Sequence, residues 1–282
     1  MTSIALLLVV CSGVIHATWN LFTKRSMNKT VFLWSFTLIA AVALFPFVAV
    51  ELWTKALATP TVYYVLLSLI SQIFYGALMS RAYHYGDLSQ VYPIIRGTSA
   101  FFVSVAGIIL FGESLSWPGW FGLACVTAGL FVISGFGKQK MDARSVKAVM
   151  FAFFVGLSTI GYSIGDKILL QSLSPLAVLE LSNVGFLVMF TWTAIRSEDL
   201  KREWQVNWKT ILLGSVLSPA SYLLFLFAMK LAPLAHIAPV REIGTVFGTL
   251  FGIYILKETQ GVRRLAMSVV IVFGIVCIGM WG

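Results

Sequence analysis

Long apolar runs follow one another along the whole chain, and they constrain its fold more than any other feature. Ten stretches of about 20 mostly apolar residues occur, each long enough for an α-helix to cross a bilayer. They cover residues 3–22, 31–50, 61–80, 90–111, 117–136, 148–168, 175–195, 210–229, 236–256 and 262–281. With 59% hydrophobic and only 11% charged residues, the chain has more apolar surface than a soluble protein of this size can bury. The sequence therefore predicts an all-α polytopic membrane protein with ten transmembrane helices in contact with the lipid bilayer.

Positive charges are distributed unevenly between the connections of these runs. Fifteen of the 20 Lys and Arg lie in the first, third, fifth, seventh and ninth connections, whereas the other side carries Lys55, Lys167 and Lys230. Since positive residues concentrate in cytoplasmic loops, we expect these odd-numbered connections inside and both termini outside, in the cytoplasmic (inner) membrane of a prokaryote. The same pattern explains the net charge of +9 without a nucleic-acid partner.

The two halves of the chain resemble each other. Gly13–Lys24 and Gly156–Lys167, 143 residues apart, share a glycine, an aromatic residue and a final lysine in register. In the fourth and ninth runs, Tyr92–Arg96 corresponds to Ala238–Arg241, with proline followed by arginine in each. At a constant offset of 145, three residues match three others: Gly107, Glu113 and Gly129 match Gly252, Glu258 and Gly274.

Each repeat contains five helices, an odd number, so the second repeat must enter the membrane from the opposite side. The sequence thus predicts two inverted five-helix repeats, residues 1–136 and 148–282, joined by a basic cytoplasmic linker over 137–147. Inverted repeats are common in secondary transporters, which bind their solute near the midplane between the halves.

The motifs of both repeats are similar to those of a known family. The Trp19…Lys and Tyr162…Lys endings of the first helices and the Pro…Gly-Glu pattern of the fourth resemble the EamA family of the drug/metabolite transporter superfamily. The resemblance covers nearly the whole chain. It implies a ten-helix secondary transporter rather than an enzyme, without cofactors, that exports or exchanges a small organic metabolite. The segment His16–Asn20 also resembles a subgroup associated with phosphonate utilisation.

Four charged residues lie within the runs and away from their ends: Arg96, Glu180, Arg241 and Glu242. Each costs about 2.5–3.5 kcal/mol at a helix centre on insertion scales, so either internal ion pairs or a polar cavity must explain them. Arg96 has no acidic residue in its own run. It therefore either pairs across helices, with Glu180 as a candidate, or binds an anionic group of the solute.

Prolines mark the same place in both halves. Pro93 and Pro239 each remove a backbone donor, which suits a gate, although simple packing kinks are an open alternative. Together with Glu180 and Glu242 they are the candidates for gating or coupling.

Polar and aromatic side chains recur in the first, third, fourth, sixth, eighth and ninth runs. They either line a cavity or form polar seams that bond their own backbone. The expected solute-binding residues are His16, Trp19, Asn20, Gln72, Tyr75, Tyr92, Arg96, Tyr162, Ser163, Tyr222 and Arg241. The arginines favour an anionic or zwitterionic solute, such as an amino acid or a phosphonate, with proton coupling as an option.

One alternative function comes from Gly161–Gly165, which matches the G-x-S-x-G pattern of serine hydrolases. It would make Ser163 the nucleophile of an intramembrane protease. The pattern lies in an apolar helical run with no strand before it, so transport is the favoured interpretation. No zinc-binding, paired-cysteine or P-loop motif occurs, and we expect no metal.

Overall fold

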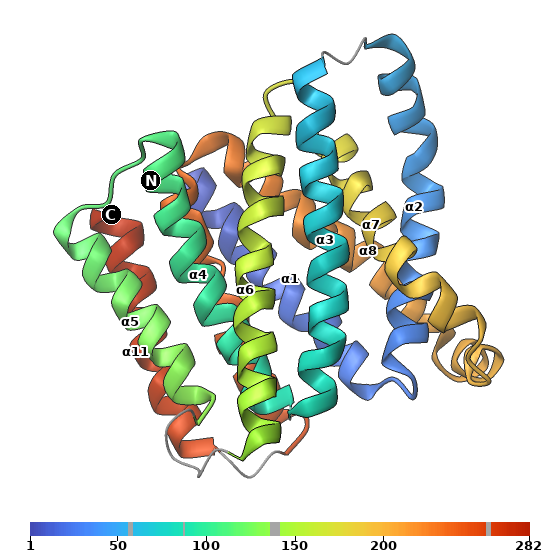
Figure 1. The fold of residues 1–282 in the computed structure, drawn as a ribbon. Helices are drawn as coiled ribbons and strands as arrows, with labels where there is room; N and C mark the ends of the chain where they lie inside the picture. Colours follow the sequence, from blue (N-terminus) through green and yellow to red (C-terminus); the bar gives the residue numbers. More distant parts are fainter. Residues whose placement is uncertain (56–58, 87, 136–141, 258–260) are drawn as a thin grey trace.

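The computed structural model describes residues 1–55, 59–86, 88–135, 142–257 and 261–282. Within these ranges the chain is all-helical, and the helices stand side by side (Figure 1). The helices are α1 (Ser3–Arg25), α2 (Lys29–Thr54), α3 (Thr59–Tyr85), α4 (Leu88–Phe111), α5 (Trp117–Ile133), α6 (Ala143–Leu169), α7 (Pro175–Ile195), α8 (Leu200–Leu231), α9 (Leu234–Val240), α10 (Ile243–Tyr254) and α11 (Gly261–Trp281). Eight are long and apolar enough to cross a membrane, and α5 is a shorter apolar helix of 17 residues. The prediction of an all-α polytopic membrane protein is confirmed.

Helices of the first half pack mainly against helices of the second half. The main contacts are α3 on α6, α5 on α11, α1 on α8 and α2 on α7, and α4 contacts both α6 and α9. Figure 1 shows α5 beside α11 and α4 beside α6, and it places both chain termini at the same end of the helices. The halves therefore interlock and form one bundle.

The contact between α5 and α11 depends on glycine. A Cβ on Gly122 would lie 2.5 Å from the Gly274 carbonyl oxygen, and a Cβ on Gly274 would lie 2.6 Å from the Gly122 carbonyl oxygen. Because neither residue has a side chain, the two backbones can approach closely, as small residues allow in membrane helices.

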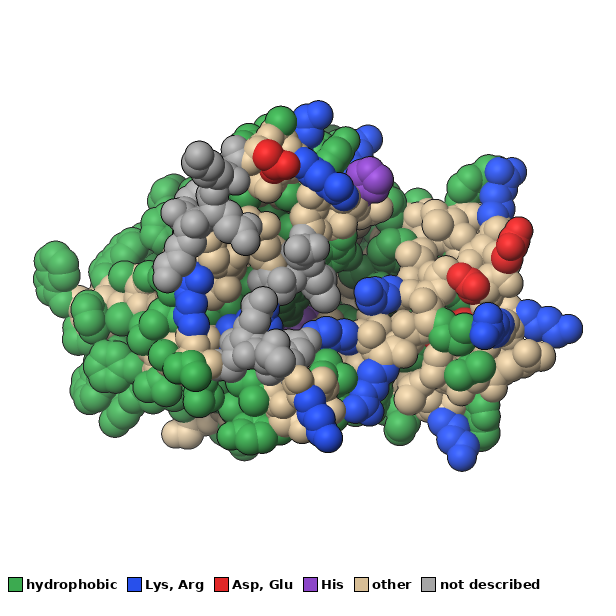
Figure 2. Space-filling model, turned by 90° about the horizontal axis from the view of Figure 1, so that it is seen from below, with side chains coloured by type: hydrophobic (Ala, Val, Ile, Leu, Met, Phe, Trp, Pro, Cys, Tyr) green, Lys and Arg blue, Asp and Glu red, His purple; other side chains and the backbone are tan. Residues whose placement is uncertain are grey.

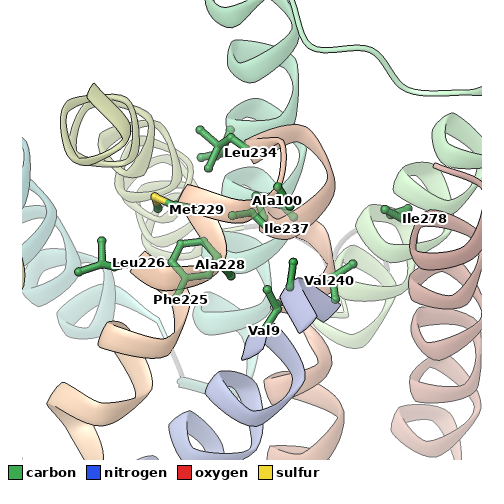
Figure 3. Packing of buried hydrophobic residues seen from close by; sticks show 14 of the residues in the cluster. Val9, Ala100, Phe225, Leu226, Ala228, Met229, Leu234, Ile237, Val240 and Ile278 are labelled. Carbon is green, nitrogen blue, oxygen red and sulfur yellow. The ribbon is translucent and has the colours of Figure 1, made fainter. Parts of the chain in front are cut away.

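The short helix α9 lies at the centre of the largest apolar cluster. All seven of its residues are buried. Figure 3 shows residues of this cluster, which come from α1, α4, α8, α9 and α11: Val9, Ala100, Phe225, Leu226, Ala228, Met229, Leu234, Ile237, Val240 and Ile278. The start of the ninth apolar run is therefore held on all sides by protein rather than by lipid.

The ninth run differs from the continuous helix expected over 236–256. Pro239 has no N–H, so the Ala235 carbonyl loses its partner within the helix. The Ser104 hydroxyl of α4 donates to that carbonyl instead, at 3.0 Å. The chain then tightens, with the Glu242 N–H donating to the Pro239 carbonyl at 3.1 Å, and α10 starts afresh at Ile243.

The seventh connection is more helical than expected. α8 begins at Leu200, well before the apolar run at 210, and bends at Asn207 (φ −112°, ψ 17°). Glu203 stabilises this early part because its buried carboxylate accepts from the Asn28 backbone N–H at 2.8 Å and from the Asn207 amide at 2.7 Å. The expected linker also changes: residues 143–147 belong to α6, while 137–141 and Glu258 lie outside the described residues.

A glutamate and a lysine hold the turn between α8 and α9. The Glu113 carboxylate accepts from the first N–H groups of α9, Leu234 at 2.8 Å and Ala235 at 2.7 Å. Lys167 donates from its Nζ atom to the Met229 carbonyl near the end of α8 at 2.8 Å and to the carbonyl of Ala232, the residue that caps this helix, at 3.0 Å. Lys167 Nζ and Glu113 Oε1 lie 3.7 Å apart. Both helix ends thus obtain partners for backbone groups that have none within a helix, at the end of the bundle opposite to the odd-numbered connections.

We expect Glu113→Ala to destabilise the protein more than Glu113→Gln. The alanine variant leaves two N–H groups of α9 without a partner, at about 1–3 kcal/mol each, whereas glutamine retains one acceptor. Thermal unfolding of the purified protein in detergent measures the difference. The matched control is Lys55→Ala, which breaks the exposed Lys55–Glu51 pair and changes stability by about 1 kcal/mol or less. A Glu113→Ala protein as stable as the wild type would contradict this account of the turn.

Candidate transport cavity

A cavity of about 1170 Å³ lies between the helices of the two halves. It opens at the end of the bundle where the odd-numbered connections lie, and its mouth is lined by Lys24, Lys29, Lys257 and Arg264. Figure 2 views this face from below and shows Lys and Arg side chains gathered around a hollow. The cavity is large enough for a small organic molecule.

The fold brings together ten of the eleven residues expected to bind solute. Those that line the cavity are His16, Trp19, Asn20, Gln72, Tyr75, Tyr92, Arg96, Tyr162, Tyr222 and Arg241. Pro93 lines it as well. Four other predicted residues lie away from the lining: Ser163, Pro239, Glu180 and Glu242. Ser163 lies on α6, is only 5% exposed, and is buried between helices instead of lining the cavity. The row of polar residues expected to face the cavity therefore does not include this position.

Aromatic rings form much of the wall. His16 and Trp19 meet edge to face with their ring centres 4.8 Å apart, and Trp19 continues to Phe36 at 5.7 Å. On another side, Tyr75 and Tyr162 meet edge to face at 6.0 Å. Such rings can stack on a flat or apolar part of a solute while their edges and hydroxyls meet its polar groups.

Two of the predicted polar residues already have partners in the protein. The Asn20 amide donates to the His16 carbonyl of its own helix at 2.8 Å. The Gln72 amide donates to the Ser182 hydroxyl at 2.7 Å, and Ser182 on α7 also lines the cavity. Asn20 thus fits the local backbone bonding left open above, whereas Gln72 joins two walls of the cavity.

Arg96 forms an ion pair with Glu242, not with Glu180. Its Nε atom lies 2.9 Å from one carboxylate oxygen of Glu242, and its terminal nitrogen lies 2.7 Å from the other. Glu180 instead accepts from the Asn183 amide at 2.9 Å. The proposed Arg96–Glu180 pair is therefore wrong, because the turn between α9 and α10 brings Glu242 to α4.

Arg241 has a different environment from Arg96. Its guanidinium carbon lies 4.2 Å from the ring centre of Phe225 and 5.2 Å from that of Tyr222. Its buried Nε atom has no hydrogen-bond partner, and no acidic side chain pairs with it in the part of the chain that the structure describes. Of Arg96 and Arg241, Arg241 is thus the one whose charge is not cancelled by a carboxylate.

Asp166 is a buried carboxylate that the sequence pattern does not single out. It lies on α6, is 0% exposed, and accepts from the Ser68 hydroxyl of α3 at 2.6 Å and from the Tyr222 hydroxyl of α8. The signal was present, since this residue falls inside the run 148–168. Its place near the end of the run, next to Lys167, suggested a membrane interface rather than a buried site.

A bundle of membrane-spanning helices around a cavity is an architecture that membrane transporters share. The chain belongs to the EamA-like transporter family, whose family model matches residues 3–135 and again residues 146–280. A protein of Listeria monocytogenes serovar 1/2a (strain ATCC BAA-679 / EGD-e), named "Putative sugar uptake protein lmo0176", is 24% identical over 215 residues, 71% of this chain and 72% of the relative. A solved structure described as "Crystal structure of protein" aligns over 100% of both chains with a TM-score of 0.75 and 14% identity, which supports the fold alone.

The alternative function as an intramembrane protease lacks a matching geometry. Ser163 is buried outside the cavity lining, and no hydrogen bond joins it to a histidine among the described residues. A serine nucleophile needs a base within hydrogen-bond reach.

We expect Arg96→Gln to destabilise the protein strongly, by about 3–5 kcal/mol, because it leaves the buried Glu242 carboxylate without a partner. Adding Glu242→Gln should recover most of the loss, since the two amides can bond each other. Thermal unfolding in detergent of the single and double variants measures both effects. Equal stability of Arg96→Gln and the wild type would show that the pair is not structural.

Proposed function

We propose that the protein is a secondary transporter that exports or exchanges a small organic solute across the cytoplasmic membrane of a prokaryote. The observation that carries this proposal is the cavity, whose lining includes residues of the odd-numbered connections, none of the described residues of the even-numbered ones, and Tyr162, Tyr222 and Arg241 between the halves. A cavity accessible from one side at a time is what alternating access requires.

We further propose ten crossings in two inverted repeats, with α9 and α10 counted as one crossing. The helix contacts support this arrangement. When the halves are exchanged, α3 on α6 becomes α8 on α1, while α2 on α7, α5 on α11 and α4 on α9 are unchanged. A two-fold relation between the repeats accounts for this pattern.

The charge of the cavity favours an anionic or zwitterionic solute. Arg96 and Glu242 cancel each other, so Arg241 leaves one positive charge at the inner end. Its guanidinium can bind a carboxylate or phosphonate through parallel hydrogen bonds. The Listeria relative is named for sugar uptake, and a sugar acid would meet both the aromatic wall and Arg241.

Substitution of Arg241 tests this function. A thermal-shift screen of carboxylates, amino acids, phosphonates and sugars selects the solute, because binding to the folded state raises stability. Flux is assayed in proteoliposomes in both directions. We expect Arg241→Lys to weaken flux and Arg241→Gln to reduce it about tenfold or more, because the glutamine variant loses a charge-assisted hydrogen bond to the solute. The matched control is Arg196→Gln, an arginine that stacks on Trp192 away from the cavity. Undiminished flux of an anion through a folded Arg241→Gln protein would contradict the proposal.

Orientation is tested separately. The bias of Lys and Arg predicts both termini outside, since positive charge stays in the cytoplasm. An alkaline phosphatase fused after Gly282 should therefore be active, and a fluorescent protein fused there should be dark when exported through the general secretory route. The reverse result would overturn the orientation and place the cavity mouth outside.

A further inference from the structure

Asp166 is a carboxylate in the membrane-spanning bundle that hydroxyl groups surround. Its two oxygens accept from the Ser68 hydroxyl at 2.6 Å and from the Tyr222 hydroxyl, and it is 0% exposed. No Lys or Arg pairs with it in the part of the chain that the structure describes. An ionised group in such a place is costly and rare in membrane proteins, and such groups mark ion pathways and proton relays.

The charged groups of the neighbouring elements are directed elsewhere. Lys167, the next residue of α6, donates to the end of α8 and lies beside Glu113. From α3 the contact is the Ser68 hydroxyl, and from α8 it is Tyr222. The described partners of Asp166 are therefore two neutral hydroxyls, and Arg241 is related to it only through Tyr222, on whose ring Arg241 packs.

Tyr222 connects Asp166 with the cavity. Its hydroxyl bonds to the carboxylate, its ring lies 5.2 Å from the Arg241 guanidinium carbon, and it lines the cavity wall. Asp166 itself does not line the cavity. It lies three residues before the end of α6, on the side of the cavity away from the mouth, next to the closed turn held by Lys167.

We propose that Asp166 is the proton-binding site that couples solute movement to the proton gradient, an inference that rests on the transport function proposed above. The ionised carboxylate accepts both hydroxyl protons, as seen here. When Asp166 takes up one proton from water, its new O–H must donate, so one of the two hydrogen bonds has to reverse. If Tyr222 gives way, its ring shifts against Arg241, and the anion site changes.

The same geometry supports exchange of one solute for one proton. With the mouth open to one face, Asp166 is shut off from the cavity by Tyr222. When the opposite face opens, the turn between α8 and α9 must move away from Lys167 and Glu113, which hold it here. Asp166 is then next to water on that side. When the bundle recloses on that side, the proton is released into the cavity once Tyr222 moves aside, so it crosses the membrane in the direction opposite to an exported solute.

The flux experiment uses the full chain in proteoliposomes, with the membrane potential clamped at zero and the solute that the thermal-shift screen selects. One proton exchanged per solute allows a gradient of one pH unit to sustain about tenfold accumulation, since one unit is worth 1.36 kcal/mol. We expect the wild type to approach this ratio. We expect Asp166→Asn to give a ratio of about one while still catalysing solute counterflow, and Asp166→Glu to restore accumulation. The carboxylate control is Glu198→Gln, an exposed residue in the seventh connection that does not line the cavity, which should accumulate solute like the wild type.

A second measurement needs no solute. Infrared spectra of the protein in lipid, recorded over a pH series, should contain the C=O band of a protonated carboxyl group that is absent from Asp166→Asn. Accumulation by Asp166→Asn, accumulation that follows a sodium gradient instead of pH, or loss of coupling in Glu198→Gln alone would overturn the proposal. Lack of the infrared band in the wild type would also overturn it, and this result does not depend on whether the Asp166→Asn variant folds well enough for the flux assay. Absence of flux for every solute, with the band present, would count against the transport function instead.

Discussion

Arg96 and Glu242 lie on different halves of the chain and meet inside the membrane, where each alone would be a costly charge. Their two contacts, at 2.9 and 2.7 Å, join α4 to the turn between α9 and α10. The turn exists because Pro239 breaks the backbone ladder and Ser104 supplies the missing donor. Because Glu242 pairs with Arg96, Arg241 has no carboxylate partner from this turn and packs on Tyr222 and Phe225 at the cavity wall. The positive charge that Arg241 places on the cavity wall thus follows from this pair.

Much of the fold could be predicted from the sequence because lipid imposes simple demands. A crossing helix must be apolar and about 20 residues long, so the apolar runs mark the helices. Polar residues such as His16, Tyr75 and Tyr222 can be assigned to an interior cavity, because exposing their polar groups to the lipid core is energetically costly. The tendency of positive charge to stay on one side likewise identifies the connections that share the face of the cavity mouth.

The errors arose where three-dimensional packing decides. The partner of Arg96 depends on the rotation that the turn at Arg241 and Glu242 introduces, which periodicity within one helix cannot supply. Ser163 lies next to Tyr162, yet a rotation of about 100° per residue places it in the packing of α6 rather than in the cavity. Asp166 resembles an interfacial residue by its position in the run, and only the approach of α3 and α8 buries it.

The basic mouth of the cavity has a consequence for how a solute arrives. Lys24, Lys29, Lys257 and Arg264 line the opening, and Figure 2 shows further Lys and Arg side chains on the same face. Such a ring creates a positive potential that raises the local concentration of anions before any of them enters the cavity. The effect reaches about 8 Å into a solution of physiological ionic strength, so anions are captured faster in dilute salt than in concentrated salt. The two faces of the membrane therefore differ not only in which one is open but also in how strongly each draws a charged molecule from solution.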